Sequence, residues 1–243
     1  MFLSIRDIHI FPAVMILLLA FQQGSYGQGS RDSISVYGIM DKAIEARGGR
    51  EFLKSIHSIS TVTKTITNGI ELSWIAKEML PNKASFQIAQ NNRLIYHSWY
   101  DGSTGFEIVK GVKKKQQPWE NKDRAYKKSL FPEFDYINAS LWKLVLVGEE
   151  NVLNEDCYKI KATLLNGSVK YLFYNKKSFL LIMEENIMEP QQYVFSNFIY
   201  LSYKKTGKLV YPHQIKYGEA GKLKDAVIVE VLINEGVDEK DFR

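Results

Sequence analysis

The first periodic segment of the chain predicts an amphipathic helix over residues 34–46. Apolar side chains recur there every three to four residues, which places them on one helical face. Ser33 is the candidate N-cap, and Gly48-Gly49 ends the helix because glycine readily adopts the backbone conformation that follows a helix. A shorter helix is expected over residues 50–56, with its apolar residues on one side. Two helices therefore precede the rest of the pattern.

From residue 58 the period of the pattern falls to two, which is the spacing of a β-strand. Residues 61–67 are β-branched at nearly every position, and Asn68-Gly69 separates them from a second run over residues 70–79. Asn-Gly between two such runs indicates a hairpin, because both central positions of a type I′ turn need a positive φ. Further strands with short turns are expected over residues 84–89, 94–100 and 104–109. This half of the chain predicts an antiparallel meander.

One long segment, residues 116–146, interrupts the meander with prolines and charges, and helices are expected around residues 121–128 and 139–146. Strand patterns then resume over residues 151–152, 157–164, 169–174, 179–184, 193–203, 208–217 and 226–234. The predicted fold class is mainly β (α+β), with one curved antiparallel sheet of roughly ten strands and helices at its start and middle. A sheet of that size must curl or close.

Alternation along the strands collects aromatic and aliphatic side chains on one face of this sheet. Tyr171 and Phe173 share a face, and the same alternation pairs Leu181 with Met183. Seven residues form the candidate lining of a hydrophobic cavity: Trp74, Phe86, Tyr96, Phe106, Tyr171, Phe173 and Met183. The alternative is a filled core in which these residues pack against the helices. Both interpretations stay open, although two or three short helices cannot easily cover so many strands.

Residues 1–27 have the order of a secretory signal peptide, with an early Arg6, an apolar run over residues 10–21 and small residues before position 28. A membrane-spanning helix needs about 20 apolar residues, and this run is shorter and contains Pro12. We therefore expect cleavage after Gly27, with a retained membrane anchor as the alternative. The remaining residues, 28–243, are expected to form a single domain. No Cys lies near the cleavage point, so a lipid anchor is not expected there.

The formal net charge of +5 is mild, but it is partly concentrated in residues 110–115, with the sequence KGVKKK. Such a cluster is typical of a solvated loop. The functional interpretation is contact with an anionic membrane surface or an acidic partner, for which the candidates are Lys113, Lys114, Lys115 and Trp119. Nucleic acid is not an expected partner, because an exported chain without a nucleic-acid motif rarely binds it.

The composition gives little sign of catalysis or metal binding. The chain has four His and one Cys, and it lacks the common hydrolase, phosphate-binding and zinc motifs. The single Cys157 excludes an internal disulfide, and we expect it to pack as a small hydrophobic residue. No catalytic residue, metal ligand or cofactor is predicted, and an enzyme is the less favoured class.

Several stretches of the sequence resemble the bacterial outer-membrane lipoprotein-sorting proteins, the LolA/LolB-like family. These stretches are AIEARGGREFLKSIHSI (43–59), YDGSTGFE (100–107), LVGEENVLNEDCYKIKA (146–162), NFIYLSYKKTGKLVYPHQI (197–215) and VLINEGVDEKDF (231–242). The resemblance implies an unclosed β half-barrel whose concave face is covered by helices. It also implies that acyl groups of lipoproteins are held non-covalently in that cavity, without a cofactor.

These observations together predict a periplasmic carrier that binds acyl chains of lipoproteins or other hydrophobic ligands for transfer towards the outer membrane. Its expected partners are the cargo and transfer proteins of the inner and outer membranes, and it is expected to be a monomer. The alternative is a non-catalytic envelope sensor or protein-interaction module with the same fold. The fold alone does not choose between these functions.

Overall fold

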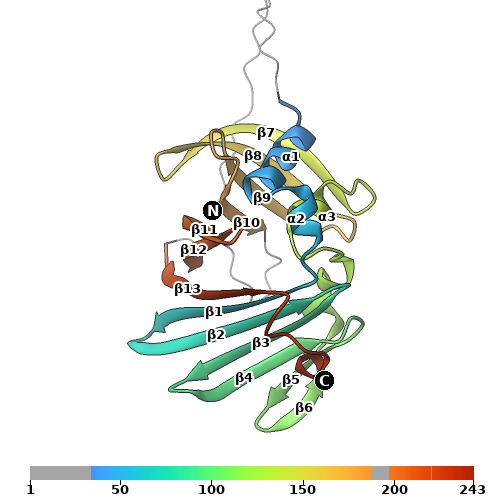
Figure 1. Cartoon of the computed structure of the whole chain (residues 1–243), viewed down its shortest axis with the longest axis vertical. Coiled ribbons are helices and arrows are strands. Elements are labelled where there is room, and N and C mark those ends of the chain that lie inside the picture. The colour runs from blue at the N-terminus through green and yellow to red at the C-terminus, as the bar shows by residue number, and fades with distance from the viewer. Residues whose placement is uncertain (1–33, 188–196, 220) are drawn as a thin grey trace, which may run out of the picture. The chain divides into compact units, whose positions relative to one another are not determined.

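The computed structural model describes residues 34–187, 197–219 and 221–243 (Figure 1). The predicted signal peptide, the candidate N-cap Ser33 and the first residues of the strand expected from residue 193 lie outside these ranges. Within the described residues, no helix is both long enough and apolar enough to cross a membrane. All statements below refer to the unit that begins at residue 34.

Thirteen strands form one antiparallel sheet in the order β6-β5-β4-β3-β2-β1-β13-β12-β11-β10-β9-β8-β7. The strands are β1 (Ser58–Thr67), β2 (Ile70–Met79), β3 (Lys83–Gln90), β4 (Arg93–Tyr100), β5 (Gly105–Val109), β6 (Val112–Lys115), β7 (Trp142–Val152), β8 (Glu155–Leu164), β9 (Val169–Asn175), β10 (Leu181–Ile187), β11 (Asn197–Thr206), β12 (Leu209–Gly218) and β13 (Lys224–Ile233). The sheet curves without closing, because β6 and β7 remain its two edges. This confirms the predicted unclosed half-barrel, although the sheet has more strands than the pattern suggested.

Short helices lie between the two ends of the curved sheet (Figure 1). Helix α1 (Val36–Ala46) has Ser35 as its N-cap in place of the predicted Ser33, and the Ser35 hydroxyl accepts a hydrogen bond of 3.0 Å from the amide of Gly38. It ends as predicted before two glycines with positive φ, and α2 (Arg50–Lys54) follows. Helix α3 (Pro132–Tyr136) belongs to the segment between β6 and β7. We call residues 116–141 the connecting segment.

The structure corrects two predictions for the middle of the chain. The helix expected over residues 121–128 is replaced by two 3₁₀ turns, η1 (Pro118–Asn121) and η2 (Arg124–Tyr126). The helix expected over residues 139–146 is wrong, because residues from Trp142 onwards form the edge strand β7. The basic cluster is also more ordered than a loop, since a turn at Lys110-Gly111 leads into the short edge strand β6. A last 3₁₀ turn, η3 (Glu239–Phe242), ends the chain.

The main core lies where α1 and α3 cover β7 to β10. We call this the inner face of the sheet and its opposite the outer face. Twelve buried residues form this core: Ile39, Met40, Ala43, Tyr136, Trp142, Leu144, Ile160, Ala162, Leu164, Leu172, Tyr174 and Leu181. A smaller cluster joins the end of α1 and α2 to β1 and to Phe131 of the connecting segment.

The predicted burial of Cys157 is confirmed, and burial raises the pKa of its thiol to about 11.

Candidate ligand-binding site

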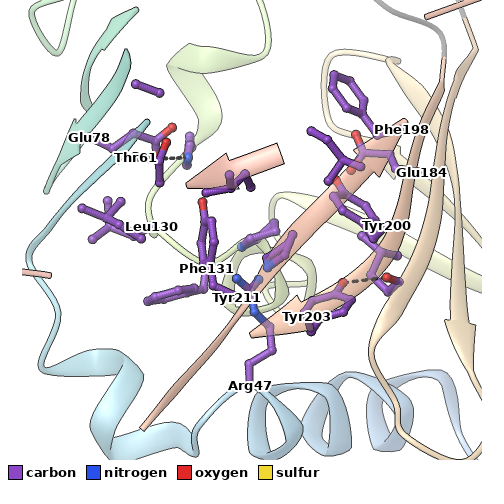
Figure 2. A pocket seen from close by; sticks show the side chains of 18 residues that line it. Arg47, Thr61, Glu78, Leu130, Phe131, Glu184, Phe198, Tyr200, Tyr203 and Tyr211 are labelled. Carbon is purple, nitrogen blue, oxygen red and sulfur yellow. Dashed lines mark hydrogen bonds and ion pairs between the residues drawn. The ribbon is translucent and has the colours of Figure 1, made fainter. Parts of the chain in front are cut away.

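A cavity of about 290 Å³ opens on the inner face beside the covered core (Figure 2). Its walls come from the end of α1, from strands β1, β2 and β10 to β13, and from the connecting segment. Most of the lining side chains are aliphatic or aromatic, and the full lining is Arg47, Ile59, Thr61, Ala76, Glu78, Lys127, Leu130, Phe131, Pro132, Leu181, Glu184, Phe198, Tyr200, Tyr203, Tyr211, Pro212, Ile215 and Ile228. The cavity is therefore assembled from segments that are far apart in the sequence.

Arg47 brings a buried positive charge to this apolar cavity. It follows α1 directly, and Figure 2 shows its side chain rising from the helices towards Phe131 and Tyr211. Its Nη1 lies 3.2 Å from a carboxylate oxygen of Glu133, whose side chain is 1% exposed. The guanidinium also lies over the rings of Phe131 and Tyr211, at 5.0 and 5.7 Å from their centroids. Burial opposes the charge, but Glu133 and the nearby tyrosines outweigh it and raise the pKa of Arg47.

One donor of Arg47 is not satisfied by the protein. Among the described residues, its Nε is buried and has no hydrogen-bond partner, while Nη1 is bound to Glu133. Leaving a buried donor without a partner has a free-energy cost of about 1 to 3 kcal/mol.

Three tyrosines form a neutral, polar part of the cavity wall. Burial raises the pKa of Tyr200 well above its ordinary value, and it raises the pKa of Tyr211 to about 12. The pKa of Tyr203 is raised in the same way, and its hydroxyl donates to the carbonyl of Leu181 at 2.6 Å. These hydroxyls therefore stay protonated at neutral pH, so this part of the wall offers hydrogen-bonding groups without charge.

A second ionic cluster fastens the connecting segment to β2. Glu78 accepts hydrogen bonds from Lys127 at 2.5 Å and from Arg124 at 3.1 Å. Burial alone would raise the pKa of Glu78, but Lys127 and Arg124 outweigh it and lower that pKa. The charges at this end of the cavity are thus already paired within the protein.

A second cavity of about 280 Å³ adjoins the first. The two share Lys127, Pro132 and Glu184 as wall residues. The second is more strongly charged, and its lining is Asp123, Arg124, Tyr126, Lys127, Pro132, Asp135, Tyr136, Trp142, Leu164, Lys170 and Glu184. Glu184 pairs with Lys170 at 2.7 Å.

Comparison with solved structures identifies this architecture. A LolA superfamily protein from Nitrosomonas europaea matches with a TM-score of 0.59 and 14% identity, over 87% of this chain and 98% of the other. A DUF1329 family protein from Desulfovibrio piger matches with a TM-score of 0.56 and 15% identity, over 86% and 97%. The domain described as an outer membrane lipoprotein-sorting protein domain from Vibrio parahaemolyticus matches with a TM-score of 0.56 and 12% identity, over 85% and 95%.

The chain has a LolA-like fold. The resemblance seen in the sequence is confirmed at the level of the fold. Sequence identities of 12% to 15% show a shared fold and nothing about function. No protein-family model and no curated protein matches the sequence. What the LolA-like fold does in this chain must therefore be argued from its own residues.

Three of the seven predicted lining residues lie on the inner face of the LolA-like fold. Trp74, Phe86 and Tyr96 form an aromatic row across β2, β3 and β4, with ring centroids 6.2 and 6.4 Å apart. Their place on the inner face follows from the register, because Phe86 pairs with the cavity residue Ala76. The row does not line the two cavities described above, but it continues the inner face from the first of them.

The other four predicted residues lie on the outer face. Phe106 stacks on Trp99, with ring centroids 5.6 Å apart. Tyr171, Phe173 and Met183 belong to an outer cluster with Cys157 and Val152. The predicted pairing of Leu181 with Met183 on one face is wrong. A register shift between them places Leu181 opposite Tyr174 of the inner core and Met183 opposite Phe173.

The basic residues lie on the edge strand β6. Lys113, Lys114 and Lys115 are exposed, and Lys113 lies over the rings of Trp99 and Phe106 at 4.8 and 4.3 Å. The side chain of Trp119 is not among those that the structure describes. The partner or membrane role of these residues stays a prediction.

Sequence reasoning missed the residues that define the cavity. Arg47 has one weak signal, its place between an amphipathic helix and two glycines, which also fits an ordinary helix end. Glu133 and Phe131 lie in a segment without periodicity, and only the fold brings them to Arg47. Among described residues, no group of three or more His, Cys, Asp or Glu could hold a metal ion.

Proposed function

We propose that this chain is a periplasmic carrier that binds acyl chains of lipoproteins, or a similar hydrophobic ligand, non-covalently on the inner face of its LolA-like sheet. The observation that carries the proposal is the cavity beside Arg47, with apolar and neutral tyrosine walls and one unsatisfied buried donor. The structural similarity to the lipoprotein-sorting protein domain from Vibrio parahaemolyticus supports the same class of cargo. The proposal assigns no catalytic residue and no cofactor, and it takes the protein as a monomer.

The size and charge of the cavity suit a chain with a small polar end. Ligand pockets typically measure about 300 to 1,000 Å³, so this cavity of about 290 Å³ can take part of a chain. Each methylene removed from water contributes about 0.8 kcal/mol. The charges that line the cavity pair within the protein, which leaves no isolated charge to oppose an apolar ligand.

The acyl carbonyl or carboxylate would then accept a hydrogen bond from Nε of Arg47. A partner for that donor removes a free-energy cost of about 1 to 3 kcal/mol. An oxygen-bearing chain should therefore bind about tenfold more tightly than an alkane of the same length. Competition of both against a fluorescent fatty acid measures this difference. Equal competition would remove Arg47 from the binding site without removing the cavity.

We further propose that the row Trp74, Phe86 and Tyr96 holds the part of the chain that extends beyond the cavity. The row is partly exposed, and its rings lie on the same face as the cavity wall. Exposed aromatic rings beside a cavity gain contact area when a chain lies over them. Phe106, Tyr171, Phe173 and Met183 have no part in this arrangement, since they lie on the outer face.

A pair of matched substitutions tests the site. Ala76→Phe places a ring in the cavity wall on β2, whereas Ala89→Phe places the same ring on the outer face of β3. We expect the first to weaken binding of a fluorescent fatty acid about tenfold or more and the second to leave it unchanged. Native mass spectrometry of the purified proteins should show acyl ligands on the wild type and the control. A wild-type protein that always purifies without an acyl ligand and does not bind acyl probes would contradict the proposal.

The second candidate function is a non-catalytic envelope sensor or protein-interaction module. Among the described strands, β6 pairs with β5 alone, and its other, basic edge favours this function because an open strand edge can accept a strand from another protein. Reversing the charges of Lys113, Lys114 and Lys115 should then abolish a specific partner complex while acyl binding is unaffected. A complex that survives this change would count against the sensor.

A further inference from the structure

The second cavity lies between the connecting segment and the last strands of the sheet. Seven of its eleven lining residues belong to the connecting segment, and the other four come one each from β7, β8, β9 and β10. Its volume of about 280 Å³ suits a small ligand or one group of a larger one. Its walls hold three carboxylates, three cations and three aromatic rings, so the pairing of the charges decides what the cavity can bind.

Each of the three cations in this wall already has a carboxylate partner. Arg124 and Lys127 pair with Glu78 at 3.1 and 2.5 Å. Lys170 pairs with Glu184 at 2.7 Å. An anionic ligand would have to compete with these carboxylates for the cations, so the wall does not favour an anion.

Asp135 of α3 is the buried carboxylate of the wall, with an exposed fraction of 6%. Its Oδ2 accepts hydrogen bonds from the amides of Lys128 and Ser129, at 3.1 and 3.3 Å. Within the described ranges, no side-chain cation forms an ion pair with it. Burial raises the pKa of Asp135, and these hydrogen bonds offset only part of that effect. A buried carboxylate without a cation is costly, because burial removes the water that would stabilise its charge.

A second carboxylate of the wall, Asp123, is bound by neutral groups. It accepts hydrogen bonds from the amide group of Asn166 at 2.8 Å and from the hydroxyl of Ser168 at 2.6 Å. With Glu78 included, four carboxylates stand against three cations around the cavity. The negative charge in excess favours a cationic ligand.

The aromatic rings of the wall indicate an organic cation. Tyr136 and Trp142 meet edge to face, with ring centroids 5.0 Å apart, and Tyr126 supplies a third ring. Lys170 lies 5.7 Å from the Trp142 centroid, so one cation already lies over a ring here. Aromatic faces attract ammonium groups. A metal ion fits less well, because no group of three or more His, Cys, Asp or Glu among the described side chains could hold one.

We propose that the second cavity binds the ammonium group of an organic amine, with Asp135 as its counter-ion and Tyr126 as part of its aromatic wall. The ammonium group supplies the charge that Asp135 lacks, and the rings replace part of its hydration. This ammonium site does not depend on what the first cavity holds.

A matched pair of small molecules tests the need for a positive charge. Choline and 3,3-dimethyl-1-butanol have the same shape, but the second has a carbon atom in place of the charged nitrogen. Ligand-observed NMR titration of the full chain should show choline bound about tenfold or more tightly than the alcohol, and ethanolamine should compete with choline. Equal binding of choline and the alcohol, or no binding of either amine, would overturn the proposal.

A matched pair of variants tests the counter-ion. Asp135→Asn removes the charge but keeps an oxygen that can accept from the two amides, and it should weaken choline binding about tenfold or more. Asp101→Asn is the control, because Asp101 also accepts from two backbone amides, at the β4–β5 turn, and does not line the cavity. It should leave the affinity unchanged. Equal affinities of the two variants would remove Asp135 from the site.

Substitutions of Tyr126 test the aromatic wall without touching the buried carboxylate. Tyr126→Leu removes the ring, so we expect choline binding to weaken about three- to fivefold while binding of the neutral alcohol stays the same. Tyr126→Phe keeps the ring and should stay within about twofold of the wild type. Equal losses for choline and the alcohol in Tyr126→Leu would indicate altered packing instead of an ammonium site.

Two lysolipids with the same acyl chain distinguish a lipid headgroup from a free amine as the source of the ammonium group. This arm rests on the proposed function, because it requires acyl binding. If the source is a headgroup, lysophosphatidylethanolamine should displace a fluorescent fatty acid about tenfold better than lysophosphatidylglycerol, and Asp135→Asn should remove that preference. Equal displacement together with binding of ethanolamine would assign the site to a free amine. Equal displacement without binding of ethanolamine would overturn the ammonium site and leave the acyl-binding proposal intact.

Discussion

The inner face of the sheet has two regions that share the same alternating pattern but differ in how deeply their inward side chains are buried. On β7 to β10 the inward side chains lie under α1 and α3, and Ile160, Leu172 and Tyr174 are completely buried. On β2 to β4 the inward side chains, such as Trp74 and Phe86, are only partly buried. We call these the covered region and the open region. Figure 1 shows the helices beside the covered strands and away from β2 to β4.

The comparison teaches that alternation predicts which face is apolar, but not whether protein or ligand covers it. The covered region supplies the stability of the fold, since complete burial of an aliphatic side chain contributes about 1.5 to 3 kcal/mol. The open region contributes less to stability and leaves apolar surface for a ligand. The cavity lies at the border between them, where Arg47 and the connecting segment meet the sheet.

The largest expected effect concerns the ion pair at that border. Glu133→Gln leaves the Arg47 charge buried without its partner, which should lower the free energy of unfolding by about 3 to 5 kcal/mol. Urea denaturation followed by circular dichroism measures this loss. Asp41→Asn is the control, because Asp41 pairs with Arg50 at the exposed surface and should change stability by at most about 1 kcal/mol. Similar losses in both variants would mean that burial of the Arg47 pair is not decisive.

The next effect separates the two regions directly. Leu172→Ala removes a completely buried side chain and should destabilise the protein by about 2 to 5 kcal/mol. Ile88→Ala removes a partly exposed side chain of the open region and should have an effect of about 1 kcal/mol. The same denaturation experiment compares them. Equal effects would show that the open region is packed as tightly as the covered one.

Ligand affinity should show the reverse order. Trp74→Ala is expected to weaken binding of a fluorescent fatty acid about tenfold, which equals about 1.4 kcal/mol, because it removes a ring from the open inner face. Phe106→Ala should leave the affinity unchanged, since Phe106 stacks on Trp99 on the outer face. Fluorescence titration of the two variants measures both. A larger loss with Phe106→Ala would place the ligand on the other side of the sheet.

The smallest expected effect is the pH dependence of the Glu78 cluster, which fastens the connecting segment to the open region. Its neighbours lower the pKa of Glu78 in the folded state, so its contribution is fully present above the unfolded pKa of about 4.3 and is lost as pH falls below that value. Glu78→Gln should reduce stability by about 1 kcal/mol at pH 7, and this difference should vanish under acid conditions. Denaturation at pH 7 and pH 3 checks it. A difference that grows in acid would contradict the assignment.

Much of the fold follows from local patterns. The α1 helix and the β1–β2 hairpin were predictable because both have clear periodicity and definite end signals, and the Asn68-Gly69 turn has the positive φ values expected of it. Strand β7 was mistaken for a helix because it is an edge strand with apolar residues on both faces. Its Leu144 is buried, yet Val145 is 45% exposed, so alternation gives little contrast.

The candidate site was much less predictable. One register shift after Leu181 moves the following side chains of β10 to the opposite face of the sheet, and no residue type in the sequence indicates this shift. The cavity brings together side chains from several strands, the end of a helix and the connecting segment, whose mutual distances depend on the curvature of the sheet. Pattern analysis could find an apolar face in such a chain, but it could not locate the opening in it.

The strand order also has a consequence for the time course of folding. Every ladder in the sheet joins strands that follow one another in the chain, with one exception, the pairing of β1 with β13. There Ile59 lies opposite Ile233, so this ladder closes nearly the whole described chain. Contacts between distant segments slow folding because a large loop must close first. We therefore expect two meanders that form by local contacts and a single late encounter of β1 with β13 that sets the folding rate.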